Sequence, residues 1–137
     1  METGHSLERT LTHHDHVRLQ RLLAQQPTRA GAQALQDLLD GSDIVSAREV
    51  PTTVVTMNSR LLLDEPHGGK RYTLTLCYPP QARPAEGLVS VLSPVGASLL
   101  GLRVGETARW RTPGGHEGAA RVLALLFQPE AHGDLAA

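Results

Sequence analysis

Titratable side chains that could hold a metal ion or exchange protons occur at three places in the chain. His13, His14 and His16 lie within one helical turn, and imidazole is a common ligand of transition metals. Ligands on one helix face must lie three or four residues apart, which only His13 and His16 do, and no third ligand accompanies them. The carboxylate pairs at 37–40 and 64–65 have no histidine or further acid beside them. The pattern favours solvated side chains over a metal or acid–base site.

Nucleophilic residues are present without a catalytic setting. Ser59, Ser93 and Ser98 all lie outside the G-x-S-x-G turn of nucleophilic serines. Cys77 alternates with apolar residues in an apparent strand and has no histidine near it, which is typical of a structural cysteine. The two glycine pairs lack the spacing of a phosphate-binding loop and are interpreted as turns. No enzyme, cofactor or metal is therefore expected.

Arg109, Trp110 and Arg111 place an aromatic ring between two guanidinium groups, an arrangement that could stack nucleic-acid bases. Strand alternation offers a simpler interpretation, in which Trp110 faces the core and both arginines face water. The chain has only four aromatic residues, so a core needs most of them. We favour the second interpretation.

Composition narrows the class of protein further. The 137 residues are 40% apolar and 20% charged, enough for one domain, or a small domain with a short appendage. A net charge of −1 disfavours independent nucleic-acid binding, and a single cysteine excludes an internal disulfide or a cysteine zinc site. The sequence contains no apolar run of about 20 residues and no signal-peptide pattern at its start. A cytoplasmic protein without membrane contact is expected.

The elements that must position these residues begin with two short helices. Thr12 is a candidate N-cap for the first helix, and Pro27 ends it. Thr28 is a candidate N-cap for the second helix, and Gly41 is expected to end it in a left-handed conformation. The result is an antiparallel hairpin over residues 1–41, with a first helix about 21 Å long at 1.5 Å per residue.

The remainder of the chain changes to strand patterns. Residues 42–53 are expected to form a connector, in which Ser46 and Glu49 match a capping box around a single helical turn. Alternation and β-branched residues then predict strands over 54–64, 71–78, 87–92, 104–112 and 119–127. Between the third and fourth strands, Ser93 and Pro94 start a helix with Gly101 near its end. We expect an α+β fold, with the domain at 54–137 built on an antiparallel or mixed sheet and one packed helix.

Five segments resemble a known family. They are VVTMNS (54–59), LSPVGASLLGLRVG (92–105), PGG (113–115), QPEA (128–131) and GD (133–134). Together they are similar to the Rnk family, the regulators of nucleoside diphosphate kinase. The stretch from Leu92 to Gly105 alone also resembles the C-terminal domain of Gre-type transcript cleavage factors. The first 40 residues match mainly in layout.

The resemblance implies a helical hairpin followed by an FKBP-like domain that docks on RNA polymerase at the rim of the secondary channel. Gre factors send a long coiled coil inward and present acidic residues at its tip to a catalytic magnesium. The hairpin here is about half the length required, and its tip, QQPTR, contains no carboxylate for that hard cation. We therefore expect a monomer that binds RNA polymerase, meets DNA only through the polymerase, and competes with Gre factors without cleaving transcripts.

By position, the resemblance assigns polymerase contact to Leu92, Ser93, Pro94 and Val95, with Leu92 standing where some Gre factors have an acidic residue. The same residues also form an ordinary helix start. Two other functions stay open. An FKBP-like fold suggests a peptidyl-prolyl isomerase, although fold is weak evidence for activity and four aromatic residues are few for such a pocket. The family name suggests a direct modulator of nucleoside diphosphate kinase, although no nucleotide-binding motif is present.

Overall fold

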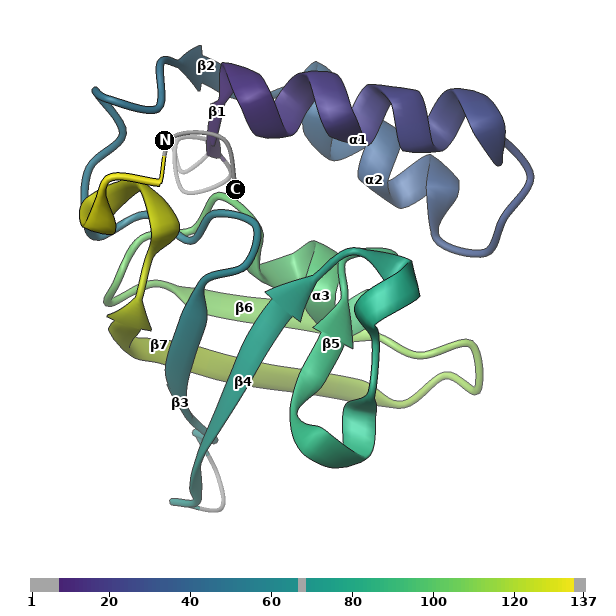
Figure 1. Cartoon of the computed structure of the whole chain (residues 1–137). Coiled ribbons are helices and arrows are strands. Elements are labelled where there is room, and N and C mark those ends of the chain that lie inside the picture. Colours follow the sequence, from purple (N-terminus) through teal and green to yellow (C-terminus); the bar gives the residue numbers. More distant parts are fainter. Residues whose placement is uncertain (1–7, 67–68, 135–137) are drawn as a thin grey trace, which may run out of the picture.

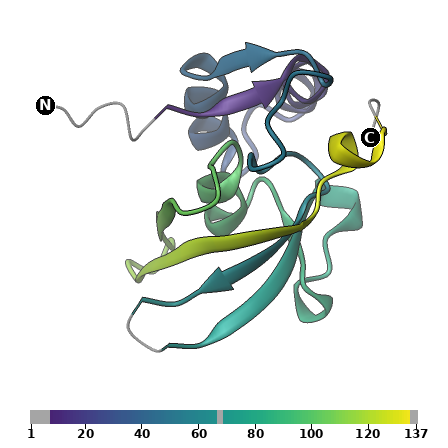
Figure 2. The ribbon, with the colours of Figure 1, turned by 90° about the vertical axis from the view of Figure 1, so that its left-hand side faces the viewer.

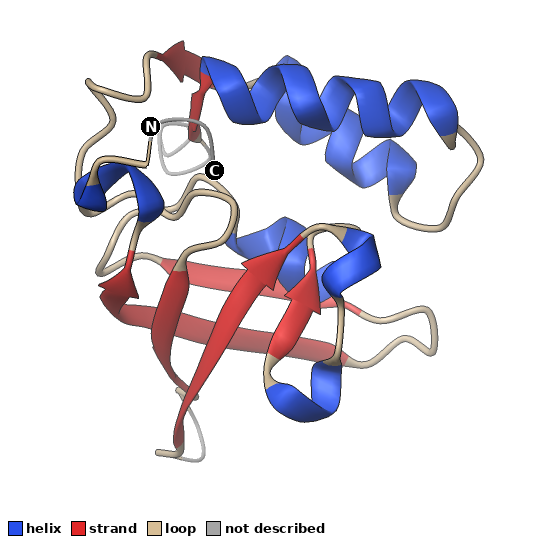
Figure 3. Ribbon diagram, in the orientation of Figure 1, coloured by secondary structure: helices blue, strands red, loops and turns tan. Residues whose placement is uncertain are grey.

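The computed structural model of the chain describes residues 8–66 and 69–134. Figure 1 shows a pair of helices lying across one side of a curved sheet, with a third helix, α3, between that pair and the sheet. The α+β class is confirmed, and Figure 3 separates the helical layer from the strands. Among the described residues, no helix is long and apolar enough to cross a membrane.

The helical hairpin consists of α1 (His13–Gln25) and α2 (Ala32–Asp40), which run side by side in Figure 1. Thr12 caps α1 as predicted, because its hydroxyl accepts a hydrogen bond from the Asp15 N–H at 3.0 Å. The helix ends just before Pro27, also as predicted. Leu19 and Leu23 of α1 and Leu35 and Leu39 of α2 supply the buried apolar stripe of the hairpin.

Two predictions for α2 are wrong. Its N-cap is Gly31 and not Thr28, because the chain first turns through residues 27–31 and Gly31 adopts a left-handed φ of 87°. Gly41 does follow the helix, but with φ −99° and not in the left-handed conformation, because its N–H closes the last helical turn on the Asp37 carbonyl.

A short parallel pair of strands ties the two ends of the hairpin together, and sequence patterns did not reveal it. β1 (Thr10–Thr12) pairs with β2 (Asp43–Val45), as the upper part of Figure 2 shows. Each strand has only three residues, which is too short for an alternation signal. The predicted single turn after β2 is present, because the Ser46 carbonyl accepts from the N–H groups of Glu49 at 3.0 Å and Val50 at 3.1 Å. The predicted capping box differs in detail, since the Ser46 hydroxyl donates to the Glu49 carboxylate at 3.0 Å.

The main sheet has five strands in the order β5-β4-β3-β7-β6. They are β3 (Arg60–Asp64), β4 (Arg71–Cys77), β5 (Leu88–Ser90), β6 (Thr107–Arg111) and β7 (Glu117–Phe127). All neighbours are antiparallel except β4 and β5, so the sheet is mixed. Three short 3-10 turns, η2 (Pro79–Gln81), η3 (Pro84–Glu86) and η4 (Pro129–His132), connect or follow these strands.

The first predicted strand is too long at its start. Only Arg60 to Asp64 pair in the sheet, while Val54 makes a single bridge to Arg103. Residues 54–59 lie in a loop whose three apolar side chains, Val54, Val55 and Met57, are fully buried outside any strand. Apolar residues are buried both in this loop and in the strand that follows, so the pattern of apolar residues could not show where the strand begins. The strands predicted at 87–92 and 104–112 also shorten to β5 and β6.

The core lies between the sheet and the helices. Leu61, Leu63, Leu76 and Val122 of the sheet are fully buried, and Leu99 of α3 joins the same cluster. α3 (Pro94–Leu99) packs against β6 and β5. Cys77 is buried and free, and burial raises the pKa of its thiol, which fits the structural role predicted for it.

Candidate functional site

The residues assigned to polymerase contact form a tight loop that ends in the N-terminus of α3. Ser93 is the N-cap: its hydroxyl accepts from the Gly96 N–H at 3.1 Å and donates to the Ser90 carbonyl at 2.7 Å. Pro94 is the first helical residue and is exposed, whereas Leu92 is only 6% exposed. Ser93 and Pro94 therefore offer accessible atoms on this loop, and the Leu92 side chain anchors it to the core.

Gly96 lets the loop lie close against α3. A Cβ at this position would come within 2.0 Å of the Ser90 carbonyl oxygen. Only glycine permits such an approach, so the position of Ser93 and Pro94 is fixed by a backbone contact. This glycine belongs to the SPVG stretch that carries the family resemblance.

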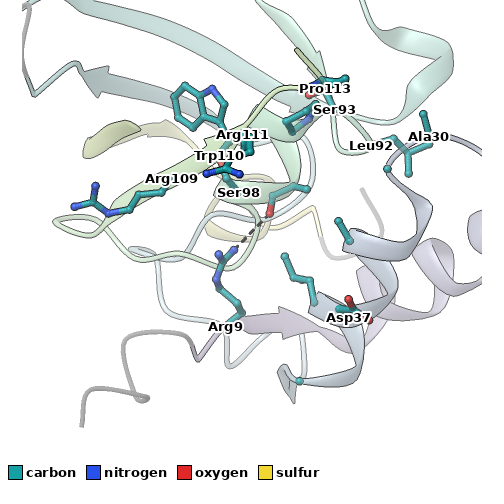
Figure 4. Close-up of a pocket in the computed structure, with 16 residues that line it drawn as sticks. Arg9, Ala30, Asp37, Leu92, Ser93, Ser98, Arg109, Trp110, Arg111 and Pro113 are labelled. Carbon is teal, nitrogen blue, oxygen red and sulfur yellow. Dashed lines mark hydrogen bonds between the residues drawn. The ribbon is translucent and has the colours of Figure 1, made fainter. Parts of the chain in front are cut away.

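A cavity of about 630 Å³ borders the loop and separates α2 from β6 (Figure 4). We call it the α2–β6 groove. Ala34, Asp37 and Leu38 of α2 form one wall, and residues 92–94 and 97–98 border the groove as well. The other wall is residues 109–111 of β6 with Pro113. Its size lies within the range of ligand-binding clefts, roughly 300–1,000 Å³.

Three guanidinium groups line the groove against one carboxylate, Asp37. Arg9 donates to the Leu100 carbonyl at 2.8 Å and to the Ala97 carbonyl at 3.5 Å, so it is committed to the end of α3. Arg111 is exposed and pairs with Glu117. Arg109 is exposed and has no hydrogen-bond or ion-pair partner among the described residues (Figure 4). The groove thus carries more positive charge than the chain as a whole.

Trp110 lies between the core and the groove. It packs on the buried cluster while remaining partly exposed, so the prediction that it faces the core is correct only in part. Gly118, its partner on β7, leaves room for the indole: a Cβ there would come within 2.4 Å of the ring. Both arginines face solvent, as predicted.

Away from the groove, the hairpin makes a buried polar contact with the loop before β3. The Asp15 carboxylate, 1% exposed, accepts a hydrogen bond from the Met57 N–H at 3.1 Å. Thr56, beside Met57, donates to the Glu130 carboxylate at 2.7 Å. We call Thr12, Asp15, Thr56, Met57 and Glu130 the Asp15 junction. It fixes the start of α1 on the loop before β3, and so fixes where α2 stands over the groove.

Burial raises the pKa of the Asp15 carboxyl to about 7, since desolvation disfavours its charged form. The Met57 hydrogen bond opposes this shift, and the negative charge of Glu130 adds to it. Tyr78 lies close to the same region: its buried hydroxyl has no hydrogen-bond partner within residues 8–66 and 69–134, and burial raises the pKa of the phenol. Arg18 stacks over the Tyr78 ring at 4.2 Å.

Metal-ligand sets are absent from the described residues: no group of three or more histidine, cysteine, aspartate or glutamate side chains converges. His13 is exposed, and His14 and His16 are partly exposed. The hairpin tip, residues 26–31, carries no carboxylate, and Arg29 there bonds to Gln26 at 2.6 Å.

Sequence reasoning located the loop at 92–95 but missed the groove beside it. Arg9 was not singled out and Asp37 was considered only as part of a carboxylate pair, because nothing in their own neighbourhoods marks a groove. The alternation around Trp110 was a usable signal, since it placed both arginines outside. The alternation could not reveal the opposite wall of the groove, because that wall is α2, about 70 residues earlier in the chain.

Comparison with known proteins agrees with this fold. Residues 50–126 match the family described as "Transcription elongation factor, GreA/GreB, C-term", which is the class of protein that the sheet and the 92–95 loop define. A solved GreA/GreB factor from Nitrosomonas europaea superposes with a TM-score of 0.73 at 32% identity, covering 87% of this chain and 99% of that one. The transcription elongation factor GreA of Bacillus anthracis is 32% identical over 81 residues, which cover 59% of this chain and 51% of that protein.

Similarity over most of the chain narrows the class to one family. The regulator of nucleoside diphosphate kinase from Escherichia coli K12 is 44% identical over 116 residues, covering 82% of this chain and 85% of that protein. The chain belongs to the Rnk family, the regulators of nucleoside diphosphate kinase, related through its C-terminal part to GreA and GreB. This confirms the resemblance found in the sequence and supports a regulator connected with transcription.

Proposed function

We propose that the chain binds RNA polymerase near the secondary channel and competes there with Gre-type factors without cleaving transcripts. The observation that carries the proposal is the exposed Ser93–Pro94 helix start on a domain that matches the GreA/GreB C-terminal family. Leu92, Ser93, Pro94 and Val95 form the contact in this proposal, with Ser93 and Pro94 as its accessible part. A contact loop held by backbone geometry loses little entropy on binding.

The hairpin supports the second half of the proposal. α1 has 13 residues and spans about 20 Å at 1.5 Å per residue. The turn at 26–31 contributes an arginine and no carboxylate, so it offers nothing that a magnesium ion binds. In this proposal a factor with such a hairpin occupies the docking site and leaves the catalytic centre of the polymerase without an added ligand. The division into a hairpin at 1–41, a connector at 42–53 and a docking domain at 54–137 belongs to the same proposal.

Competition on purified core RNA polymerase tests this function. A labelled Gre-type factor is bound to the polymerase, and the chain is added as unlabelled competitor. We expect displacement, weakened about fivefold by Pro94→Ala, the effect of losing about 1 kcal/mol at a contact residue. Pro84→Ala is the matched control, because Pro84 is also exposed and also begins a short helical turn. No displacement by the folded wild-type chain would refute the docking proposal.

A cleavage assay on a stalled elongation complex separates competition from catalysis. The chain alone is expected to release no RNA fragment, and to suppress the fragments that a Gre factor releases. Fragment release by the chain alone would contradict the silent role assigned to its tip.

The name of the Escherichia coli relative favours one alternative, direct contact with a nucleoside diphosphate kinase. Pull-down of purified kinase by the purified chain, in the absence of polymerase, tests it. Stoichiometric capture together with failure to bind polymerase would replace our proposal with this one.

A further inference from the structure

The sheet ends at β6, and the α2–β6 groove runs along that edge. β6 pairs with β7 on one side only, and among the described residues no backbone hydrogen bond reaches its other edge. Three successive residues, 109 to 111, all line the groove. Since successive strand residues point to opposite faces, a cavity that touches all three lies along the strand's edge. α3 packs against β6 as well, but residues 109–111 stay open to the groove.

The two faces of this edge differ in chemistry. Ala108 and Trp110 lie on the face that packs towards the core, where Ala108 is 1% exposed. Arg109 and Arg111 lie on the other face and are exposed. An extended segment placed beside β6 would therefore meet apolar side chains on one face and guanidinium groups on the other. Leu38 and Ala34 of α2 extend the apolar side across the groove.

The positive charge at the β6 edge determines which kind of extended segment fits beside it. Arg109 has no hydrogen-bond or ion-pair partner among the described residues, and Arg111 forms a surface ion pair with Glu117. The lining of the groove holds one carboxylate, Asp37, on the opposite wall. A second copy of the same edge is a poor occupant, since pairing two such strands would bring arginines close to arginines.

We propose that the free edge of β6 accepts, as an added strand, an extended segment of the partner protein in which acidic and apolar residues alternate. In the antiparallel register with β7, the N–H and C=O groups of Arg109 and Arg111 point away from β7, whereas those of Trp110 point towards it. Backbone hydrogen bonds to Arg109 and Arg111 supply affinity that does not depend on sequence, and the two faces of the strand supply the choice of side chains. The inference deepens the proposed function, on which the assignment of that segment to RNA polymerase rests.

A model peptide tests the edge without polymerase. The probe is a blocked heptapeptide of alternating glutamate and valine, and the signal is the fluorescence of Trp110, the single tryptophan of the chain. We expect saturable binding with a Kd below about 1 mM. The same peptide with lysine in place of glutamate, or with proline in place of the central valine, is expected not to bind, because the first reverses the charge and the second breaks the strand.

Charge reversal on the protein completes the test. Arg109→Glu is expected to weaken the glutamate peptide at least about tenfold and to admit the lysine peptide. Arg48→Glu is the matched control, since Arg48 is exposed in the connector and does not line the groove. Amide hydrogen exchange distinguishes strand addition from side-chain attraction: bound peptide should slow exchange at Arg109 and Arg111, whose N–H groups face the free edge, more than at Trp110, which faces β7. Binding without that protection, or equal binding by both variants, would overturn the inference.

The polymerase experiment separates this inference from the proposed function. If wild type displaces a Gre factor, Pro94→Ala weakens displacement and Arg109→Glu does not, docking stands and the added strand is refuted. If the peptide binds with protected amides while wild type fails on polymerase, the edge is an acceptor and the polymerase assignment falls. Weakening by both variants, with Arg48→Glu unchanged, supports both.

Discussion

Two regions where the hairpin faces the rest of the molecule differ in character. At the Asp15 junction a carboxylate is almost fully buried and is held by a backbone N–H from a loop 42 residues away. At the α2–β6 groove the surfaces stay apart, and the charges there are exposed guanidinium groups. The first contact fixes the hairpin, and the second leaves a cationic edge available.

The contrast between the Asp15 junction and the α2–β6 groove indicates how the groove stays open. Hydrophobic burial alone would draw α2 onto β6, because Leu38 and Trp110 are both partly exposed apolar groups. Directional contacts prevent this: the Asp15 carboxylate anchors the start of α1, and Gly31 sets α2 on the Leu92 carbonyl. Polar contacts at the Asp15 junction and the close approach of Gly31 to Leu92 therefore hold the hairpin beside the Ser93–Pro94 loop.

The largest expected effect is the pH dependence of stability through Asp15. The folded pKa of about 7 lies above the value of about 3.9 for an unfolded chain, so the folded state binds the proton more tightly. Stability from this group is complete below about pH 4 and declines as the pH rises to about 7. The total is roughly 4 kcal/mol, because the pKa differs by about three units and each unit is worth about 1.4 kcal/mol.

Urea unfolding of wild type and Asp15→Asn at several pH values measures this term. The amide keeps an oxygen for the Met57 N–H and cannot ionise, so its difference from wild type should grow in its favour from pH 4 to pH 7. Contributions from histidines and other acids cancel in the difference. A difference that does not vary with pH would mean that Asp15 is not the titrating group.

Gly31→Ala should have the next largest effect. Its φ of 87° already disfavours a side chain, and a Cβ would come within 2.0 Å of the Leu92 carbonyl oxygen. Gly133→Ala is the matched control, because Gly133 has φ 83° and nothing within 4 Å of the added carbon. We expect about 1 kcal/mol for the control and about 2–3 kcal/mol more at Gly31, measured by denaturant unfolding. Equal losses would show that α2 does not rest on the loop.

These two positions show what the sequence could and could not reveal. The helix starts at Thr12 and at Ser93 were predictable because an N-cap is a local device that acts over three residues. Asp15 sits among three histidines at such a start, and nothing nearby distinguishes a solvated acid from one that is buried against Met57. Gly31 resembles any loop glycine until Leu92, 61 residues later, is placed beside it.

The candidate site divides in the same way. Ser93 and Pro94 were found because their motif is contiguous and specific. The groove depends on Arg9 and α2 lying opposite β6, and the parallel β1–β2 pair that holds these segments is too short to leave a pattern. The groove therefore forms through tertiary contacts between distant segments, whereas the loop at 92–95 forms through local contacts that its own sequence specifies.

Arg9→Met should cost an intermediate amount. The guanidinium donates to two carbonyls at the end of α3, and methionine keeps the apolar stem while removing both bonds. We expect a loss of about 1–2 kcal/mol in unfolding free energy, because hydrogen bonds to a charged donor are worth more than neutral ones. Arg48→Met, at an exposed position of the connector, should change stability by less than about 0.5 kcal/mol. Similar values for the two variants would remove Arg9 from the structural contacts of the groove.

The smallest effect is expected where the groove edge is most exposed. Arg111 and Glu117 form a surface pair whose side chains are 71% and 68% exposed, and such pairs contribute about 0–1 kcal/mol. Arg111→Gln should therefore lower the unfolding free energy by no more than about 0.5 kcal/mol, with less difference still at high salt. A loss as large as that of Arg9→Met would mean that the cationic edge holds the sheet together, and the contrast between a fixed junction and an available edge would fail. A small loss leaves the positive charge of β6 unexplained by folding, as expected for a surface that binds an acidic partner.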